Sequence, residues 1–222
     1  MNSPLGLGRN FMNTTYASYD KKITAIVMAA GYGKRFGGNE DKLLTMFSGK
    51  PMFQWTLDLL ETMPFLEVIL IARSQAILEF GASKGYRCLQ NSLAQEGMSA
   101  SIRLGVENAD EGSDGYMFFT SDQPMLKEET VFQLMSVFQD RPEYIIVPIF
   151  SGKRGSPTIF PARYRNDLLA LGGDVGGKII IEQNIRSVSF VEIEDEMSLI
   201  DLDTKEALRN AESILKAGKH ER

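Results

Sequence analysis

ITAIVM, residues 23–28, runs directly into the glycine-rich segment AAGYGKRFGG, residues 29–38. The first six residues are almost all apolar or β-branched, as in strands that are buried on both faces of a parallel sheet. The glycines that follow allow backbone N–H groups to approach a bound anion without obstruction from a Cβ atom. A buried strand that ends in such a turn is typical of α/β proteins, which bind ligands at the carboxyl ends of their strands.

Strand and helix patterns alternate along the rest of the chain. Further strands are expected at 67–72, 87–89, 116–120, 144–148, 157–160 and 187–193. Helices are expected from Pro51, at 75–83, from Met98 or Ser99, from Lys127, and at 163–171, 177–183 and 205–216. This alternation predicts one α/β domain over residues 22–217, with a single doubly wound, mostly parallel, Rossmann-like sheet. Residues 1–21 are expected to be a disordered leader or an expression remnant, and residues 218–222 a flexible tail.

Composition excludes several classes of protein. Lys and Arg number 24 against 29 Asp and Glu, so the formal charge of −5 gives no global attraction to nucleic acids or to an anionic membrane. No apolar run approaches the roughly 20 residues needed to cross a bilayer. The chain has one cysteine, Cys88, and one histidine, His220. They cannot form an internal disulfide, a cysteine-built zinc site or a histidine-based triad, and a cytoplasmic location is expected.

The glycine-rich segment carries cations suited to a polyphosphate. Lys34 and Arg35 lie within it and Lys42 follows closely. The spacing G-x-G-x-x-x-G is one residue longer than the dinucleotide-binding fingerprint, and no GK[ST] is present for a P-loop. We expect a phosphate-binding loop of another kind. A glycine-rich connection with solvated cations is the alternative.

Asp122 follows the apolar run 117–120 and should therefore be presented at the ligand-binding edge of the sheet. A carboxylate there suits Mg²⁺ that is bound largely through water and substrate phosphates. Alternatively, Asp122 caps the next turn. Asp201 and Asp203 could supply a second metal ligand or could cap the last helix, and the sequence favours neither role.

Six segments together resemble the nucleotidyltransferases related to molybdenum cofactor guanylyl- and cytidylyltransferases, in the Rossmann-like NTP-transferase superfamily. The residues that carry the resemblance are Ala29-Ala30-Gly31-x-x-x-Arg35-x-Gly37 with Lys42, 97–102 (GMSASI), 121–124 (SDQP), Gly155-x-Pro157, Leu171-x-Gly173-Asp174-x-Gly176 and Asp201-x-Asp203-Thr204. The double alanine resembles the cytidylyl branch, because the guanylyl branch usually has Ala-Gly-Gly. Gly33, Phe36 and Ser156 depart from the residues common in the family, which are Ser, Met and His.

The resemblance implies Mg²⁺-dependent transfer of CMP from CTP to the phosphate of molybdopterin, with release of pyrophosphate. It implies catalytic roles for Arg35 at the leaving pyrophosphate, Lys42 at the α-phosphate and Asp122 at the metal, with Asp203 as second metal ligand. The implied binding residues are Ala29, Ala30, Gly31, Gly33, Gly37 and Ser101 for the nucleotide, and Gly155, Gly173, Asp174 and Gly176 for the acceptor. A molybdenum hydroxylase is a candidate partner that would receive the product.

Two other functions remain open from the sequence. The chain could transfer a nucleotide to another acceptor, such as a sugar phosphate or methylerythritol phosphate, or use GTP as donor. It could also be a non-catalytic maturation factor that hands the cofactor to a molybdenum hydroxylase. Residues 173–177 could likewise serve only as a turn between two helices.

Overall fold

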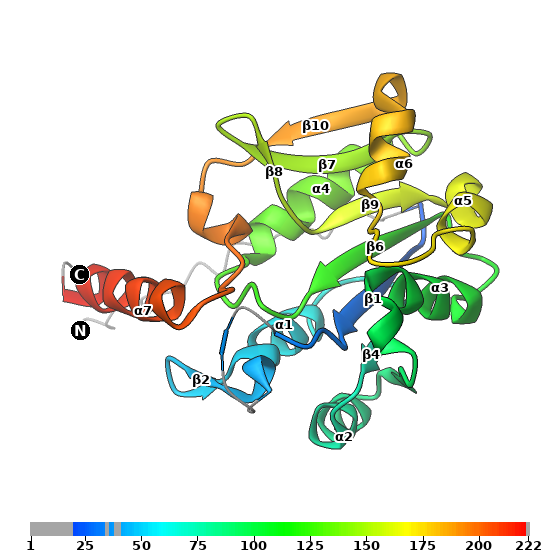
Figure 1. Ribbon diagram of the computed structural model, residues 1–222. Helices are drawn as coiled ribbons and strands as arrows, with labels where there is room; N and C mark the ends of the chain where they lie inside the picture. The colour runs from blue at the N-terminus through cyan, green and yellow to red at the C-terminus, as the bar shows by residue number, and fades with distance from the viewer. Residues whose placement is uncertain (1–19, 34–35, 38–40, 221–222) are drawn as a thin grey trace, which may run out of the picture.

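A computed structural model describes residues 20–33, 36–37 and 41–220, with side chains as far as residue 216. Its centre is a sheet with the strand order β10-β7-β9-β6-β1-β4-β5, in which β8 pairs with β7 (Figure 1). The strands of this sheet are β1 (Ile23–Ala29), β4 (Glu67–Ala72), β5 (Arg87–Gln90), β6 (Gly115–Thr120), β7 (Ile145–Phe150), β8 (Lys153–Arg154), β9 (Thr158–Pro161) and β10 (Val188–Glu192).

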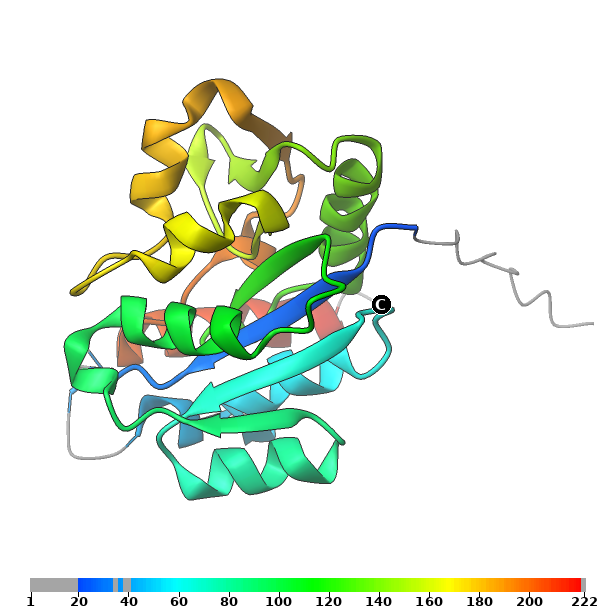
Figure 2. The same ribbon diagram turned by 90° about the vertical axis from the view of Figure 1, so that its right-hand side faces the viewer.

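The sheet is mostly parallel, as predicted. β1 lies between β4 and β6 and is parallel to both, so that Val27 stands opposite Leu70 on one side and Phe119 on the other. β4 and β5 are also parallel, and Figure 2 shows β1, β4 and β5 side by side. β9 is antiparallel to both of its neighbours, β6 and β7. The parallel strands all end at the same edge of the sheet, which is where a ligand site is expected.

Helices cover both faces of this sheet because successive residues of a strand point to opposite sides. On β1, Ala25 and Val27 belong to a buried cluster with the apolar residues of α1, α2 and α4, whereas Ile26 packs with those of α3, α5 and α6. The helices are α1 (Met52–Leu60), α2 (Gln75–Ser83), α3 (Met98–Asn108), α4 (Glu128–Asp140), α5 (Arg165–Leu169), α6 (Lys178–Gln183) and α7 (Lys205–His220). Burial of each large aliphatic side chain in these layers is worth about 1.5–3 kcal/mol.

Two local features differ from the sequence prediction. The helix expected at 163–171 is a short 3₁₀ turn, Ala162–Tyr164, followed by α5, which ends at Leu169. Pro51 precedes α1 as its N-cap instead of lying in its first turn. It is the last residue of a hairpin that the sequence did not predict, formed by β2 (Met46–Phe47) and β3 (Lys50–Pro51). Strands of two residues are too short to show a periodic pattern.

The hairpin and α7 form a third layer of packing beside the sheet (Figure 1). Phe47 and Met52 join Leu202, Leu208 and Ala211 in a buried cluster that is separate from the two cores of the sheet. Leu202 is fully buried, and its backbone N–H donates to the carbonyl oxygen of Asp122 at 2.9 Å. This packing holds the segment that precedes α7 against the carboxyl end of β6.

Candidate active site

A cavity of about 670 Å³ lies at the carboxyl ends of β1 and β6, a volume in the range of small-molecule binding sites. It is lined by the ends of both strands, by the start of α3 and by residues from five loops. The lining residues are Met28, Ala30, Gly31, Tyr32, Gly33, Lys42, Leu43, Ala94, Gln95, Gly97, Met98, Ser101, Thr120, Ser121, Asp122, Asp174 and Asp203. Predicted nucleotide, metal and acceptor residues thus share one cavity.

Asp122 lies two residues beyond β6 and enters this cavity. Its Oδ2 atom accepts a hydrogen bond from the Lys42 ammonium at 2.8 Å. Its Oδ1 atom is buried and has no hydrogen-bond partner among the described residues. The carboxylate therefore does not cap the turn that follows β6, and the alternative interpretation of Asp122 is wrong.

Lys42 is the one cationic side chain that lines the cavity among the residues that the structure describes. It opens the 3₁₀ turn Lys42–Leu44, and its side chain is 6% exposed. Its Nζ atom donates to Asp122 Oδ2 and to Asp203 Oδ1, each at 2.8 Å. Burial lowers the pKa of Lys42, but the two carboxylates outweigh burial and raise the pKa above its ordinary value of 10.5. The ammonium is therefore charged at neutral pH, and two of its three N–H groups are engaged.

Asp201 and Asp203 come to the same place from the segment before α7. The cap of α7 is Thr204, whose hydroxyl oxygen accepts from the backbone N–H of Ala207 at 3.1 Å. Asp203 pairs with Lys42 as described, while Asp201 Oδ1 accepts from the Thr120 hydroxyl at 3.5 Å. Desolvation, together with the charges of Asp122 and Asp203, raises the pKa of Asp201 to about 7. Two carboxylates thus pair with one ammonium, and a third carboxyl group, that of Asp201, lies close enough to feel their charges.

The donor set at this point fits a hard divalent cation. Oxygens of Asp122 and Asp203 converge on one nitrogen atom, and the second oxygen of Asp122 has no partner within the described residues. Carboxylate oxygens are the protein ligands that Mg²⁺ prefers. In the described part of the chain, no group of three His, Cys, Asp or Glu side chains is arranged to hold a metal ion. An ion bound here would therefore complete its coordination with water and substrate phosphates, as Mg²⁺ commonly does.

The glycine-rich segment forms another wall of the cavity. Ala30, Gly31 and Gly33 line it, whereas Ala29 is buried within β1 and Gly37 is not among the lining residues. Gly33 has a φ of +57°, a conformation that favours glycine. Lys34, Arg35 and Gly38 lie outside the described residues.

Arg73 was not among the residues predicted from the sequence, and it holds this segment in place from the end of β4. Its Nε donates to the carbonyl oxygen of Ala30 at 3.0 Å, and its guanidinium lies 4.0 Å from the centre of the Tyr32 ring. It also lies 3.9 Å from the carboxylate of Asp41. Its position directly after the apolar run 67–72, at the ligand-binding edge of the sheet, was the signal in the sequence.

The predicted acceptor residues divide into two groups. Asp174 lines the cavity, and Gly173 and Gly176 lie directly behind it against the first turn of α3. Gly155 lies elsewhere, because its nearest contacts are with the side chain of Leu199 and it does not line the cavity. The segment 170–177 does connect α5 to α6, so it is both a turn between helices and a contributor to the cavity.

Ser101, predicted at the base of the nucleotide, lines the cavity from α3 and is 5% exposed. Its hydroxyl accepts from the side-chain amide of Asn91 at 3.0 Å. Asn91 is itself buried and was not predicted, since a single asparagine after a short strand carries no distinguishing pattern. The pair fixes one side of the cavity with a polar group in an otherwise apolar layer.

Comparison with known proteins relates the chain to one family model and to relatives with two different named activities. Residues 25–188 match the family model described as the MobA-like NTP transferase domain. The chain is 34% identical over 122 residues to a probable molybdenum cofactor guanylyltransferase of Thermococcus gammatolerans, which covers 55% of this chain and 60% of that protein. It is 27% identical over 199 residues to nicotine blue oxidoreductase of Paenarthrobacter nicotinovorans, which covers 84% of this chain and 94% of the relative.

The fold is also found among solved structures. Rv0371c from Mycobacterium tuberculosis H37Rv has a TM-score of 0.75 at 22% identity, and the match covers 87% of this chain and 98% of that one. A complex of Rv0371c with manganese has a TM-score of 0.71 at 20% identity, and covers 87% and 99% of the two chains. These structures share the mostly parallel α/β architecture described above.

Proposed function

The chain belongs to the MobA-like NTP transferase family, and from this we propose that it transfers CMP from CTP to the terminal phosphate of a molybdopterin-type cofactor and releases pyrophosphate. The observation that carries the proposal is the cluster of Lys42, Asp122 and Asp203 beside the glycine-rich segment in one cavity. A cation, two carboxylates and a glycine-lined turn are the groups that a metal-bound triphosphate requires. We take residues 22–217 as the transferase domain.

Asp122 and Asp203 would hold Mg²⁺ through their carboxylate oxygens. When bound, the ion would neutralise phosphate charge and help to orient the triphosphate. Lys42 keeps one N–H group that is not engaged by these carboxylates, and we assign it to an oxygen of the α-phosphate. Arg35 is assigned to the leaving pyrophosphate, and backbone N–H groups of the glycine-rich segment to the triphosphate.

The site contains no histidine, and the proposed reaction needs no general base. The terminal phosphate of a pterin acceptor is already ionised at neutral pH, so it can attack the α-phosphorus without losing a proton. The chain must instead hold the two reactants in line and offset the charge of the transition state. A buried Lys42 that is charged at neutral pH suits this purpose, because its ion pairs raise its pKa and fix the position of the ammonium.

The choice of base rests on Ala29, Ala30 and Ser101. The double alanine supports CTP, whereas the relative from Thermococcus gammatolerans is named as a guanylyltransferase. Arg73 engages the Ala30 carbonyl, so that part of the hydrogen-bonding capacity of the base-facing backbone is already in use. Thermal shift with each of the four nucleoside triphosphates, with and without Mg²⁺, tests the donor. Mg–CTP should raise the melting temperature most, and a larger effect of Mg–GTP would reverse the assignment.

The acceptor is assigned to the side of the cavity formed by Gly173, Asp174 and Gly176, with Gly155 as a more distant contributor. Pyrophosphate release should be measured with CTP or GTP and with molybdopterin, a sugar phosphate or methylerythritol phosphate as acceptor. Release that depends on both CTP and molybdopterin is expected. Turnover with a different acceptor would replace the proposed substrate, and tight pterin binding without nucleotide binding would indicate a carrier.

The relative named as an oxidoreductase sets a further control. An enzyme that transfers hydride has no need for two carboxylates paired with a buried lysine, and this cluster favours a transferase. Oxidation of NADH or NADPH in the presence of a quinone-type dye should therefore not be accelerated by the chain.

No helix in the described part of the chain is long and apolar enough to span a membrane. We place the reaction in the cytoplasm, with a molybdenum hydroxylase as recipient of the product.

A further inference from the structure

The loop between α5 and α6 is fixed to α3 through its backbone. The hydroxyl of Ser99, a fully buried residue, donates to the carbonyl oxygen of Gly173 at 2.6 Å. Arg103, one turn further along α3, donates from Nη1 to the carbonyl oxygen of Leu171 at 2.5 Å and to Ser99 Oγ at 3.2 Å. Its Nη2 pairs with Glu96 at 3.1 Å. One guanidinium therefore orients both the loop and the serine that binds the loop.

The same loop lies in direct contact with the first turn of α3. A Cβ atom at Gly97 would stand 2.5 Å from Asp174 Cα, which shows that the two backbones touch. The backbone N–H of Met98 donates to Asp174 Oδ1 at 3.3 Å. Residues 97, 98 and 174 all line the cavity, so any displacement of the loop changes the shape of this wall.

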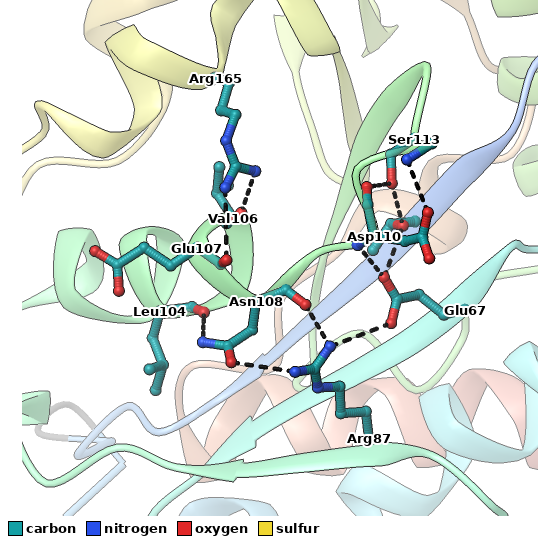
Figure 3. A network of polar contacts seen from close by, with 11 residues as sticks. Glu67, Arg87, Leu104, Val106, Glu107, Asn108, Asp110, Ser113 and Arg165 are labelled. Atoms are coloured by element: carbon teal, nitrogen blue, oxygen red, sulfur yellow. Dashed lines mark hydrogen bonds and ion pairs between the residues drawn. The ribbon is translucent and has the colours of Figure 1, made fainter.

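The opposite end of α3 is anchored by two other arginines (Figure 3). Arg87 donates to the carbonyl oxygen of Asn108 at 2.6 Å, and Arg165 donates to that of Val106 at 2.5 Å. These contacts hold the carboxyl end of the helix, far along its axis from the cavity. With α3 fixed at that end, the loop is held by the partly buried contacts of Ser99 and Arg103 and by the longer hydrogen bond from the Met98 backbone.

We propose that Arg103, together with Ser99, is a positioning residue for the acceptor. It holds the loop of residues 171–174 in place, so that the cavity keeps the width that the acceptor requires. This inference rests on the proposed function, because that function assigns Gly173 and Asp174 to the acceptor. Neither Arg103 nor Ser99 lines the cavity, so both act through the loop. The contribution is geometric, since a displacement of about 1 Å in a substrate-binding wall can cost up to about 100-fold in rate.

The test compares Arg103→Met, Arg103→Lys, Arg103→Met combined with Ser99→Ala, and the control Arg87→Met in the full chain. Hydrogen–deuterium exchange of peptides over 170–177, without any ligand, measures how firmly the loop is held. Steady-state kinetics with Mg–CTP and molybdopterin measure the KM of each substrate. Arg87→Met is a matched control because it removes the same type of arginine-to-carbonyl contact from the other end of α3.

Arg103→Met should accelerate exchange in 170–177 about tenfold and raise the KM for molybdopterin about tenfold or more, while the KM for CTP changes less than about twofold. Arg103→Lys should recover part of both effects, because lysine retains the charge beside Glu96 but lacks the planar fork. Ser99→Ala combined with Arg103→Met should add little to Arg103→Met, since both act on one loop.

Exchange that is unchanged in Arg103→Met, or equally accelerated in Arg87→Met, would overturn the inference. So would a loosened loop with an unchanged KM for molybdopterin, or a KM for CTP that rises in parallel. Failure of the proposed function is seen separately, as wild-type chain that binds Mg–CTP but does not release pyrophosphate with molybdopterin. In that case the exchange measurement still decides whether Arg103 positions the loop.

Discussion

Gly33 packs directly on Lys42: a Cβ atom at position 33 would lie 2.8 Å from the Cβ atom of the lysine. This distance is shorter than any ordinary contact between two carbon atoms. The glycine therefore allows the glycine-rich segment to approach the residue that pairs with Asp122 and Asp203. Serine is common at this position in the family, but in this chain the Cβ atom of a serine would collide with Lys42.

Gly33→Ala should displace Lys42 and lower kcat/KM for CTP by at least about tenfold, as well as stability by about 1–3 kcal/mol. Gly85→Ala, outside the cavity, is the matched control. Gly85 also has a positive φ, +78°, but a Cβ atom there would meet nothing within 4 Å. The control should show only the strain of the left-handed backbone, about 1–2 kcal/mol, with kcat/KM nearly unchanged. Equal losses of activity in both variants would contradict a specific contact with Lys42.

Asp122→Asn should lower kcat by at least about 100-fold, because the neutral amide is a much weaker ligand for Mg²⁺ and less able to orient Lys42. The fold should survive, since Lys42 keeps its ion pair with Asp203. Kinetics over a range of Mg²⁺ concentrations and the melting temperature provide the measurement. Glu182→Gln, which removes an exposed ion pair with Lys178 of 3.7 Å, should leave both unchanged. Retention of wild-type kcat in Asp122→Asn would remove the metal assignment.

Asp201 should make stability depend on pH in a defined direction. Its pKa is raised to about 7 from 3.8, so between these values the folded chain binds more protons than the unfolded chain. The free energy of unfolding therefore falls as pH rises from about 4 to 7, and levels off above. At about 1.4 kcal/mol per pH unit the full shift is worth about 4 kcal/mol. The carboxyl group is desolvated but the residue as a whole keeps contact with solvent, so screening reduces this contribution to about 1–2 kcal/mol.

Asp201→Asn should consequently be more stable than the wild type by about 1–2 kcal/mol at pH 8 and by little at pH 4. Urea unfolding without divalent ions measures the difference. Asp203→Asn serves for comparison, because it breaks an ion pair with Lys42 and should destabilise the chain at pH 8. A gain in Asp201→Asn that is the same at both pH values would mean that ionisation of this carboxyl group is not its cause.

Arg73→Met should raise the KM for CTP by about five- to tenfold with little change in kcat, because Arg73 holds Ala30 and Tyr32 without lining the cavity. Arg73→Lys should recover little, since lysine cannot place a planar group on the Tyr32 ring and donate to Ala30 together. Steady-state kinetics at saturating acceptor give both parameters. A large fall in kcat with an unchanged KM would place Arg73 at the reacting phosphates instead.

Much of the fold follows from patterns that are local in the sequence. The apolar run of β1, the glycines after it and the position of Asp122 after β6 can each be identified within about ten residues. Because carboxyl ends of parallel strands meet at one edge, these local patterns also predicted that Ala30, Gly31 and Asp122 face a common cavity. Charge near the glycine-rich segment and ahead of the last helix pointed to Lys42 and Asp203, and the family resemblance added Ser101 and Asp174. All four line the cavity.

The contacts that assemble the site depend on tertiary packing. Lys42 is 80 residues from Asp122 and 161 residues from Asp203 in the sequence, and no local period relates them. Burial of Leu202 beneath α7 and the hairpin places Asp203 beside Asp122. The antiparallel direction of β9 also depends on its neighbours, since the side-chain alternation of a strand of four residues does not indicate in which direction the strand will pair. Periodicity determines which residues form strands and helices, whereas the pairing of distant charges is determined by how those elements pack.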